Sequence, residues 1–270
     1  MKCVHPESSW PDSWKYSYPY DLQEIYGKIT NYGYAYAYQN RRSATLKMVR
    51  EVVPVGGRIL DIAGAQGNFS LTLAEMGYRV TWNDLREELA DYVKLKHEKG
   101  EIDFAPGNAF ELEFKEPFDC VLATEIIEHV AHPDEFLRKA AAMVRPGGYV
   151  VLTTPNGAYF RNTLPRFSDC PNPEQFEDRQ FGPNSDGHIF LMWPDELQFL
   201  GNKAGLSIDQ LLLFTNPLSN GHMKTQIALK ILPKAMVDGI ERISAAAPSA
   251  IVRRIMAHSG VRYQRPAIHH

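Results

Sequence analysis

Two carboxylates and an imidazole lie close together near the middle of the sequence. Glu125, Glu128 and His129 are spaced i, i+3 and i+4, so on a helical turn they would share one face. Such oxygen and nitrogen atoms can bind a divalent cation. His188, at the end of a proline-rich stretch, is a candidate for a second imidazole ligand. Mixed ligands of this kind suit Mg²⁺, Mn²⁺ or Zn²⁺, and availability favours Mg²⁺.

The same residues support more than one kind of chemistry. A cation at this turn could hold a hydroxyl group in line for reaction and lower its pKa. The imidazole of His129 could instead act as a general base at neutral pH without a metal. A purely structural role for the turn is the third interpretation. The candidate catalytic residues are therefore His129, Glu125 and His188.

A second candidate site begins at an acidic residue followed by small ones. Asp61 opens the run DIAGAQG, which ends at Gly67 and leads into a predicted helix. Small residues leave room for a cofactor to approach the backbone closely. Asp84, seventeen residues after Gly67, suits the two hydroxyls of a ribose. This layout predicts a nucleotide-type cofactor between the two acids.

These side chains need a scaffold of alternating strands and helices. Strands are predicted at residues 58–62, 78–82, 102–105, 118–123 and 149–153. Helices are predicted at residues 41–53, 68–76, 86–97, 134–144, 194–204 and 233–258. Residues 207–214 and 224–232 are predicted to form an antiparallel pair of strands. Strands separated by helices of this length form a parallel sheet with right-handed crossovers. We therefore expect a Rossmann-like α/β fold with a seven-stranded, mostly parallel sheet, helices on both faces and antiparallel last strands.

Five motifs occur in the order found in class I S-adenosylmethionine (SAM)-dependent methyltransferases, and the chain resembles that family over about residues 45–235. The loop after residue 61 is similar to the family's Asp-x-Gly-x-Gly-x-Gly motif, with Ala63 and Ala65 replacing two glycines. Asp84 matches the second acid. The run GNAF at 107–110 takes the place of the adenine-contacting segment. FDCV at 118–121 and RPGG at 145–148 resemble the fourth-strand motif and the turn before the fifth strand.

The resemblance implies SAM as the cofactor. It places the methionine part against Asp61 and its loop, the ribose against Asp84, and the adenine between Asn108 and Ala109. The implied cofactor-binding residues are Asp61, Ala63, Gly64, Ala65, Gly67, Asn68, Phe69, Asp84, Leu85, Asn108, Ala109, Phe110 and Thr124. A nicotinamide cofactor is disfavoured because a pyrophosphate needs closer backbone contact than a methionine carboxylate does. The alternative is a doubly wound domain that packs tightly at this turn and binds no SAM.

The metal-type residues carry a resemblance of their own. The set Glu125, Glu128, His129 and His188 is similar to the Glu-x-x-Glu-His plus distal His arrangement of metal-dependent O-methyltransferases. Those enzymes act on small RNAs, quinones or saccharides. The resemblance implies metal-assisted methyl transfer to a hydroxyl of a small-molecule or saccharide acceptor. The alternatives are an RNA 2′-O-methyltransferase, a metal-free methyltransferase acting on nitrogen or carbon, and a SAM-binding module without catalysis. A net charge of −3 and a pI near 6.3 disfavour a nucleic-acid partner.

The chain is expected to divide into an aromatic-rich N-terminal arm (1–40), a methyltransferase domain (41–235) and a C-terminal helical segment (236–270). Residues 154–193 carry five prolines and are expected to be a lid or substrate insertion. In the arm, Tyr32, Tyr34, Tyr36 and Tyr38 alternate with smaller residues. Their rings would share one side of an extended segment but would spread around a helix. Arg41 and Arg42 could contact an anionic acceptor, but a solvated helix start is the favoured interpretation.

Other sequence features predict where in the cell the protein is located. No apolar run approaches the length of a membrane span, and the N-terminus lacks the layout of a secretory signal. We therefore expect a cytoplasmic protein without a membrane partner. Cys3, Cys120 and Cys170 show no paired or metal-type spacing and are expected to be reduced thiols. His258 is expected at the surface.

Overall fold

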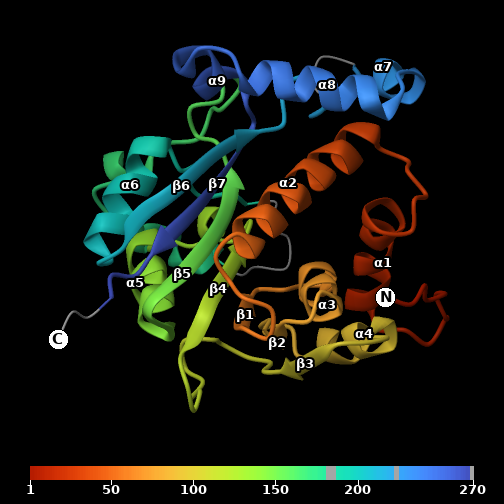
Figure 1. Cartoon of the computed structure of the whole chain (residues 1–270), viewed down its shortest axis with the longest axis vertical. Helices are drawn as coiled ribbons and strands as arrows, with labels where there is room; N and C mark the ends of the chain where they lie inside the picture. Colours follow the sequence, from red (N-terminus) through yellow and green to blue (C-terminus); the bar gives the residue numbers. More distant parts are fainter. Residues whose placement is uncertain (181–186, 222–224, 268–270) are drawn as a thin grey trace.

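The computed structural model describes residues 1–180, 187–221 and 225–267 (Figure 1). The strands are β1 (Arg58–Ile62), β2 (Arg79–Trp82), β3 (Glu101–Phe104), β4 (Phe118–Thr124), β5 (Val144–Pro155), β6 (Ser207–Phe214) and β7 (His258–Gln264). The α-helices are α1 (Asp12–Glu24), α2 (Tyr32–Arg50), α3 (Asn68–Glu75), α4 (Leu89–Lys96), α5 (Pro133–Met143), α6 (Pro194–Lys203), α7 (Gln226–Ile231), α8 (Lys234–Ala245) and α9 (Ser249–Ile255). Short 3₁₀ helices are η1 (Ile127–His129), η2 (Phe167–Asp169) and η3 (Pro173–Arg179).

The described strands form one seven-stranded sheet in the order β3-β2-β1-β4-β5-β7-β6. The first five strands are parallel, and β7 lies antiparallel between β5 and β6. The strand order reverses beside β1, which is where ligands bind in open sheets of this kind, at the carboxyl ends of the strands. The predicted fold class, a Rossmann-like, mostly parallel sheet with antiparallel last strands, is confirmed.

Alternating side chains of the central strands build a core on each face of the sheet. Ile59 points toward a cluster that includes Met48 of α2 and Leu73 of α3. Leu60, the next residue, points toward the opposite cluster, which includes Leu137 of α5 and Leu197 of α6. This period of two is the expected geometry of a strand buried on both sides. Helices therefore cover both faces, and the carboxyl edge of the sheet is left for the loops.

The C-terminal third differs from the sequence prediction in two ways. Residues 226–231, expected as part of the strand 224–232, form helix α7 instead; residue 224 lies outside the described residues. The antiparallel partner of β6 is β7, at residues 258–264, within the segment 236–270 that we expected to be helical. A short apolar run does not distinguish a helix from a strand by pattern alone, so only the sheet edge next to β5 identifies the missing strand.

The N-terminal arm is helical and is fixed to the domain by a buried ion pair. Lys96 Nζ of α4 lies 2.7 Å from Asp21 Oδ2 of α1, and both side chains are fully buried. Tyr92 donates to the same carboxylate over 2.7 Å. The tyrosines of 32–38 lie in α2, so their rings spread around the helix axis, and Tyr38 is buried against Phe69.

The insertion between β5 and α6 contains η2 and η3, and its residues 181–186 lie outside the described part of the chain. Among the described residues, no helix is both long enough and apolar enough to cross a bilayer.

Candidate functional site

Asp61, at the carboxyl end of β1, is a buried acid with only one of its two carboxylate oxygens in a hydrogen bond. Its Oδ2 accepts a hydrogen bond from Ser70 Oγ at 2.5 Å, and its Oδ1 has no hydrogen-bond partner among the described residues. Burial raises the pKa of Asp61 to about 7, with the charge of Asp84 adding to the rise and the hydrogen bond from Ser70 opposing it. A buried carboxylate oxygen without a protein partner can accept a hydrogen bond from a ligand or a water molecule. A cationic ligand would stabilise its ionised form.

The loop after Asp61 has a backbone that favours glycine. Ala63, Ala65 and Gly67 have φ values of 55°, 47° and 73°, all in the left-handed region that costs an L-residue roughly 1–2 kcal/mol. Ala63 and Ala65 stand where the class I methyltransferase motif has glycines, so these two alanines carry the backbone strain. Gly64 is required for a different reason, because a methyl group there would lie 2.7 Å from the indole of Trp82.

Asp84 ties this loop to the end of β2. Its Oδ2 accepts from the backbone amide of Ala65 at 2.9 Å, and its Oδ1 accepts from the backbone and side chain of Arg86 at 2.9 and 3.0 Å. Arg86 Nη2 also donates to Oδ2 at 3.2 Å, so the four or so acceptor positions of the carboxylate are occupied. A ribose hydroxyl could bind Asp84 by displacing the side chain of Arg86, which is 45% exposed. The structure thus brings together the two acids that the sequence placed on separate strands.

The predicted adenine segment forms the turn after β3. Asn108 Oδ1 accepts from Phe110 N at 3.1 Å, and its Nδ2 donates to Glu111 at 2.7 Å. Ala109 is buried, whereas Leu85 is exposed beyond Asp84. Phe110 packs edge-on against Phe136. Both polar atoms of the Asn108 side-chain amide therefore form hydrogen bonds within this turn.

A residue that the sequence did not single out, Glu24 of α1, contacts the same loop. Its Oε2 accepts from Asn68 Nδ2 at 2.7 Å and from Gln66 Nε2 at 3.1 Å, and Tyr34 donates to its Oε1. Because the contacts span more than forty residues of chain, no local pattern could have revealed them. Glu24 adds a negative charge beside the start of α3.

Three of the four predicted metal-type residues come together at the carboxyl end of β4. The ligand atoms of Glu128, His129 and His188 all lie within 4.8 Å of one another, and the two imidazole rings meet edge-to-face with centroids 4.8 Å apart. Glu128 is fully buried, and its Oε2 accepts from Thr154 Oγ1 at 2.9 Å. Its Oε1 has no hydrogen-bond partner within the described ranges. This donor set fits a divalent cation.

Burial raises the pKa of Glu128 well above its usual range, and the negative charge of Glu125 adds to the effect. Without a cation the carboxyl of Glu128 therefore favours its neutral form.

Glu125, the fourth residue, has different neighbours because the backbone turns at its position. Its φ is 52°, so it precedes η1 rather than sharing one helical face with Glu128, as the i, i+3 spacing predicted. Its Oε2 lies 3.2 Å from Arg41 Nη1 and 3.8 Å from His258 Nε2. Burial raises the pKa of Glu125, but the charges of Arg41 and His258, with smaller contributions from Thr153 and His188, together lower the pKa below its usual value.

Two expectations are corrected by this cluster. Arg41 does not lie at a solvated helix start, because it is inside α2 with its side chain mostly buried against Glu125. His258 is not a surface residue, because it begins β7, stacks on Phe214 with an interplanar angle of 8° and keeps only 15% of its side chain exposed. Both side chains come from elements whose neighbours are set by tertiary packing.

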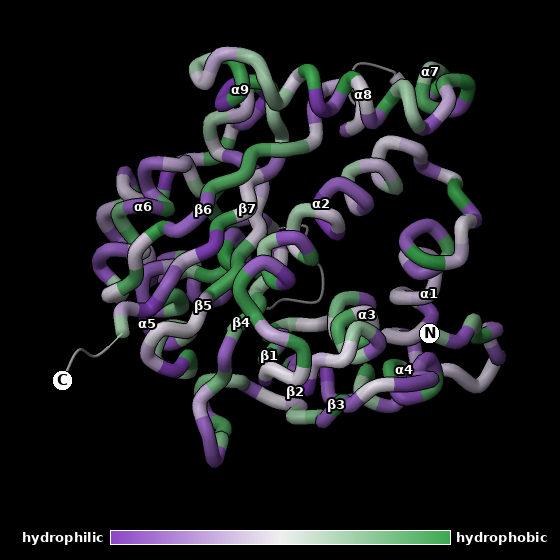
Figure 2. Tube along the Cα trace, in the orientation of Figure 1, coloured by the Kyte–Doolittle hydropathy of each residue, from purple (hydrophilic) through white to green (hydrophobic). Residues whose placement is uncertain are grey.

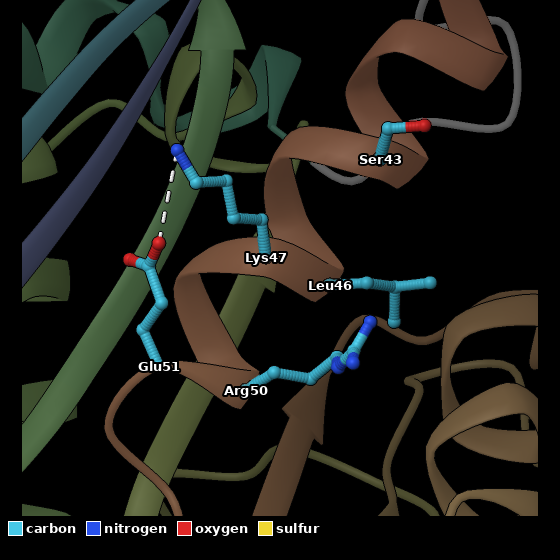
Figure 3. Close-up of a pocket in the computed structure, with 5 residues that line it drawn as sticks. All are labelled: Ser43, Leu46, Lys47, Arg50 and Glu51. Carbon is cyan, nitrogen blue, oxygen red and sulfur yellow. Dashed lines mark ion pairs between the residues drawn. The ribbon is translucent and has the colours of Figure 1, made fainter.

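A cavity of about 460 Å³ lies along α2, lined by Ser43, Leu46, Lys47, Arg50 and Glu51 (Figure 3). Lys47 and Glu51, one turn apart on α2, form an ion pair with 3.7 Å between Nζ and Oε1. None of its lining residues is a predicted site residue. The chemistry-bearing groups lie instead at the carboxyl ends of β1, β2 and β4.

The sequence profile of a family described as a methyltransferase domain matches residues 35–211. A ubiquinone biosynthesis O-methyltransferase from Caulobacter sp. is 40% identical over 147 residues, which cover 53% of this chain and 56% of that protein. A ubiquinone biosynthesis O-methyltransferase from Rhizobium leguminosarum is 34% identical over 170 residues, covering 61% and 65%. The matched segments span less than two thirds of these relatives.

Solved structures share the fold. An S-adenosylmethionine-dependent methyltransferase from Mesorhizobium loti superposes with a TM-score of 0.55 at 16% identity, covering 82% of this chain and 98% of that one. A putative methyltransferase in complex with the Haloferax volcanii Trm112 activator superposes with a TM-score of 0.55 at 15% identity, covering 84% and 91%. Likeness at this identity shows the arrangement of strands and helices only.

Proposed function

Because the chain belongs to the methyltransferase domain family, we propose that it transfers a methyl group from SAM to a hydroxyl of a small-molecule acceptor. The observation that carries the proposal is the hydrogen bond from Ala65 N to Asp84. It draws the loop after β1 and the acid after β2 together at the carboxyl edge of the sheet, where a nucleoside cofactor is bound in open sheets. The ubiquinone-biosynthesis relatives support oxygen as the accepting atom and a small molecule as the acceptor.

Bound SAM supplies an electrophilic methyl group on a positively charged sulfur. In our proposal the unpartnered Oδ1 of Asp61 accepts from the amino group of the methionine part. Gly67, the N-cap of α3, has no side chain to cover the first amides of that helix, so these amides can bind a carboxylate. Asp84 accepts from the ribose hydroxyls in place of the exposed side chain of Arg86. Leu85, Asn108, Ala109 and Phe110 form the surroundings of the base.

We further propose that Glu128, His129 and His188 hold a divalent cation, with Mg²⁺ favoured and Mn²⁺ or Zn²⁺ also suited to the donors. A cation at these atoms would hold the acceptor hydroxyl and lower its pKa. Glu125 would stay ionised beside Arg41, as its lowered pKa indicates, and would place a negative charge next to the reaction rather than a fourth ligand. Without a cation, His129 is the residue positioned to accept the proton.

Methyl transfer from radiolabelled SAM tests the proposal. The acceptor panel should contain catechol-type quinone precursors, saccharides and short RNAs, and we expect incorporation into the hydroxylated small molecules. Asp84→Ala should weaken SAM binding by about tenfold to a hundredfold, because it removes hydrogen bonds to a charged acceptor. Asp91→Ala is the matched control, since Asp91 is an exposed acid on α4 that pairs only with Lys94 among the described residues. Incorporation into none of the acceptors, together with no SAM binding at millimolar concentration, would refute the proposal.

A further inference from the structure

Large apolar side chains are exposed on the three C-terminal helices. Thirteen large apolar residues are exposed in the described chain, and six of them fall within the thirty residues of 226–255. They are Ile227, Ile231, Met236, Ile240, Ile243 and Ile251, with exposed fractions between 36% and 75%. Scattered exposed apolar residues are ordinary, whereas a concentration of them marks an interaction surface. We call the exposed part of α7, α8 and α9 the C-terminal helical surface.

These residues repeat at helical spacing. Met236, Ile240 and Ile243 are spaced i, i+4 and i+7, so they share one face of α8, and Ile227 and Ile231 do the same on α7. Of the twelve residues of α8, only Val237 is buried. The three helices lie in a row at one end of the molecule (Figure 1), where apolar and polar segments alternate along the chain (Figure 2). The helices are therefore amphipathic, with an apolar face that the described chain leaves uncovered.

The charge of this surface is opposite to that of the whole chain. Residues 226–255 contain five basic and two acidic residues, a net charge of +3, whereas the whole chain carries −3. Glu241, one of the two acids, faces the domain, where it accepts from Asn216 N at 3.0 Å and from Ser219 Oγ at 2.7 Å. Arg253 and Arg254 are exposed on α9. Lys234 pairs with Asp238 at 2.7 Å, so the net positive charge comes from Lys230, Arg242, Arg253 and Arg254, less Glu241. Apolar and cationic side chains on the same helices complement a surface that is anionic at its headgroups and apolar below them.

The C-terminal helical surface adjoins the candidate site. Asn156, two residues after the Thr154 that hydrogen-bonds Glu128, donates to the carbonyls of Arg253 and Met256 at 2.8 Å. The exposed ring of Phe160 extends the surface, because Phe160 N donates to Arg254 O at 2.9 Å. α9 leads through residues 256 and 257 directly to His258 beside Glu125.

We propose that the C-terminal helical surface docks on an anionic lipid bilayer, with α7 and α8 lying in the plane of the interface. Amphipathic helices that carry Lys and Arg beside an apolar face bind such surfaces without crossing them. This changes our expectation of no membrane partner, which rested on the absence of a run long enough to span. The docking proposal depends only on the C-terminal helical surface. Its consequence is that an acceptor dissolved in the membrane would reach the candidate site at the interface, and this consequence rests on the proposed function.

Flotation of the whole chain with vesicles tests the docking without SAM or acceptor, so its outcome is separate from that of the methyl-transfer assay. We expect binding to phosphatidylcholine mixed with phosphatidylglycerol, weakened by salt, and at least about tenfold weaker binding to phosphatidylcholine alone. The double variant Ile240→Asp/Ile243→Asp should lose about tenfold or more in vesicle affinity. Arg253→Gln/Arg254→Gln should lose about tenfold through the charges alone.

Phe199→Asp is the matched control, because Phe199 is 62% exposed, between Ile240 at 36% and Ile243 at 75%, but lies on α6. Its vesicle binding should equal that of the unmodified chain. All changed residues are exposed, so the thermal unfolding midpoints should agree and rule out misfolding. Two results would overturn the proposal. One is a chain that binds neither kind of vesicle. The other is a dimer in solution that Ile243→Asp dissociates while vesicle binding stays unchanged, because the surface would then join two copies of the chain.

Discussion

The guanidinium of Arg41 lies 3.2 Å from the carboxylate of Glu125, although one residue belongs to α2 and the other follows β4. Both side chains are less than one fifth exposed. The pair joins α2 to the carboxyl edge of the sheet, and it leaves Glu125 ionised in a buried setting where Glu128, three residues on, favours its neutral form. The ion pair with Arg41 thus gives two neighbouring carboxyl groups different ionisation states.

Removing Arg41 should leave the Glu125 carboxylate buried without its main partner. We expect Arg41→Met to lower the free energy of unfolding by about 3–5 kcal/mol, since breaking one side of a buried pair strands the other charge. Adding Glu125→Gln to that variant should recover much of the loss. Urea unfolding measures both. Lys47→Met serves for comparison, because it breaks only the exposed pair with Glu51 and should change stability by less than about 1 kcal/mol. Equal effects of the two single changes would contradict this account.

Asp61 should make stability depend on pH. Its pKa in the folded chain is about 7, above the ordinary aspartate value of 3.8, so between these values the folded state binds more protons than the unfolded state. The contribution of Asp61 to stability is therefore present at low pH and is lost as pH rises toward 7. We expect the unfolding free energy of the unmodified chain, relative to Asp61→Asn, to fall by about 1.4 kcal/mol per pH unit from pH 5 to 6 and to level off above pH 7. A difference that does not change across this range would show that Asp61 is not so perturbed.

Metal removal should act through the cluster of Glu128, His129 and His188. Treatment with EDTA should abolish methyl transfer, and adding Mg²⁺ or Mn²⁺ should restore it. In calorimetric titration, His188→Ala should weaken Mn²⁺ binding by about a hundredfold. Even loss of a residue that only hydrogen-bonds a metal ligand lowers metal affinity by about ten- to a hundredfold. His132→Ala is the control, since that imidazole lies away from the cluster against Glu177 at 2.8 Å. Full activity in EDTA would remove the metal from the mechanism.

Gly64 should tolerate no side chain. A methyl group there would lie 2.7 Å from Trp82, and Trp82 is fixed by burial and by its hydrogen bond to Ala65 O at 3.1 Å. Gly64→Ala should therefore destabilise the chain by about 1–3 kcal/mol and weaken SAM binding. Gly239→Ala is the control, and we expect it to raise the stability of the chain. An added methyl at this position in α8 meets no described atom within 4 Å, and replacing a helical glycine by alanine stabilises by about 0.5–1 kcal/mol. Thermal unfolding of both variants decides the point.

The order of motifs along the chain was sufficient to predict the first five strands and the position of the cofactor-type acids. Asp61 and Asp84 each end a strand, and parallel neighbours bring such ends to one edge, so their proximity follows from the sequence pattern. The same reasoning failed for α7 and β7, because a six- or seven-residue apolar segment is compatible with either structure until a neighbouring strand supplies hydrogen bonds.

The sequence by itself therefore determined the first five strands of the sheet, the small-residue loop and the grouping of Glu128 with His129, since these depend on periodicity and on neighbours a few residues apart. Only the tertiary structure decided what surrounds Glu125. Its left-handed backbone separates it from Glu128, and Arg41, 84 positions earlier, and His258, 133 positions later, reach it from α2 and β7. Contacts at such separations are set by how whole elements pack against the sheet, which no local spacing encodes.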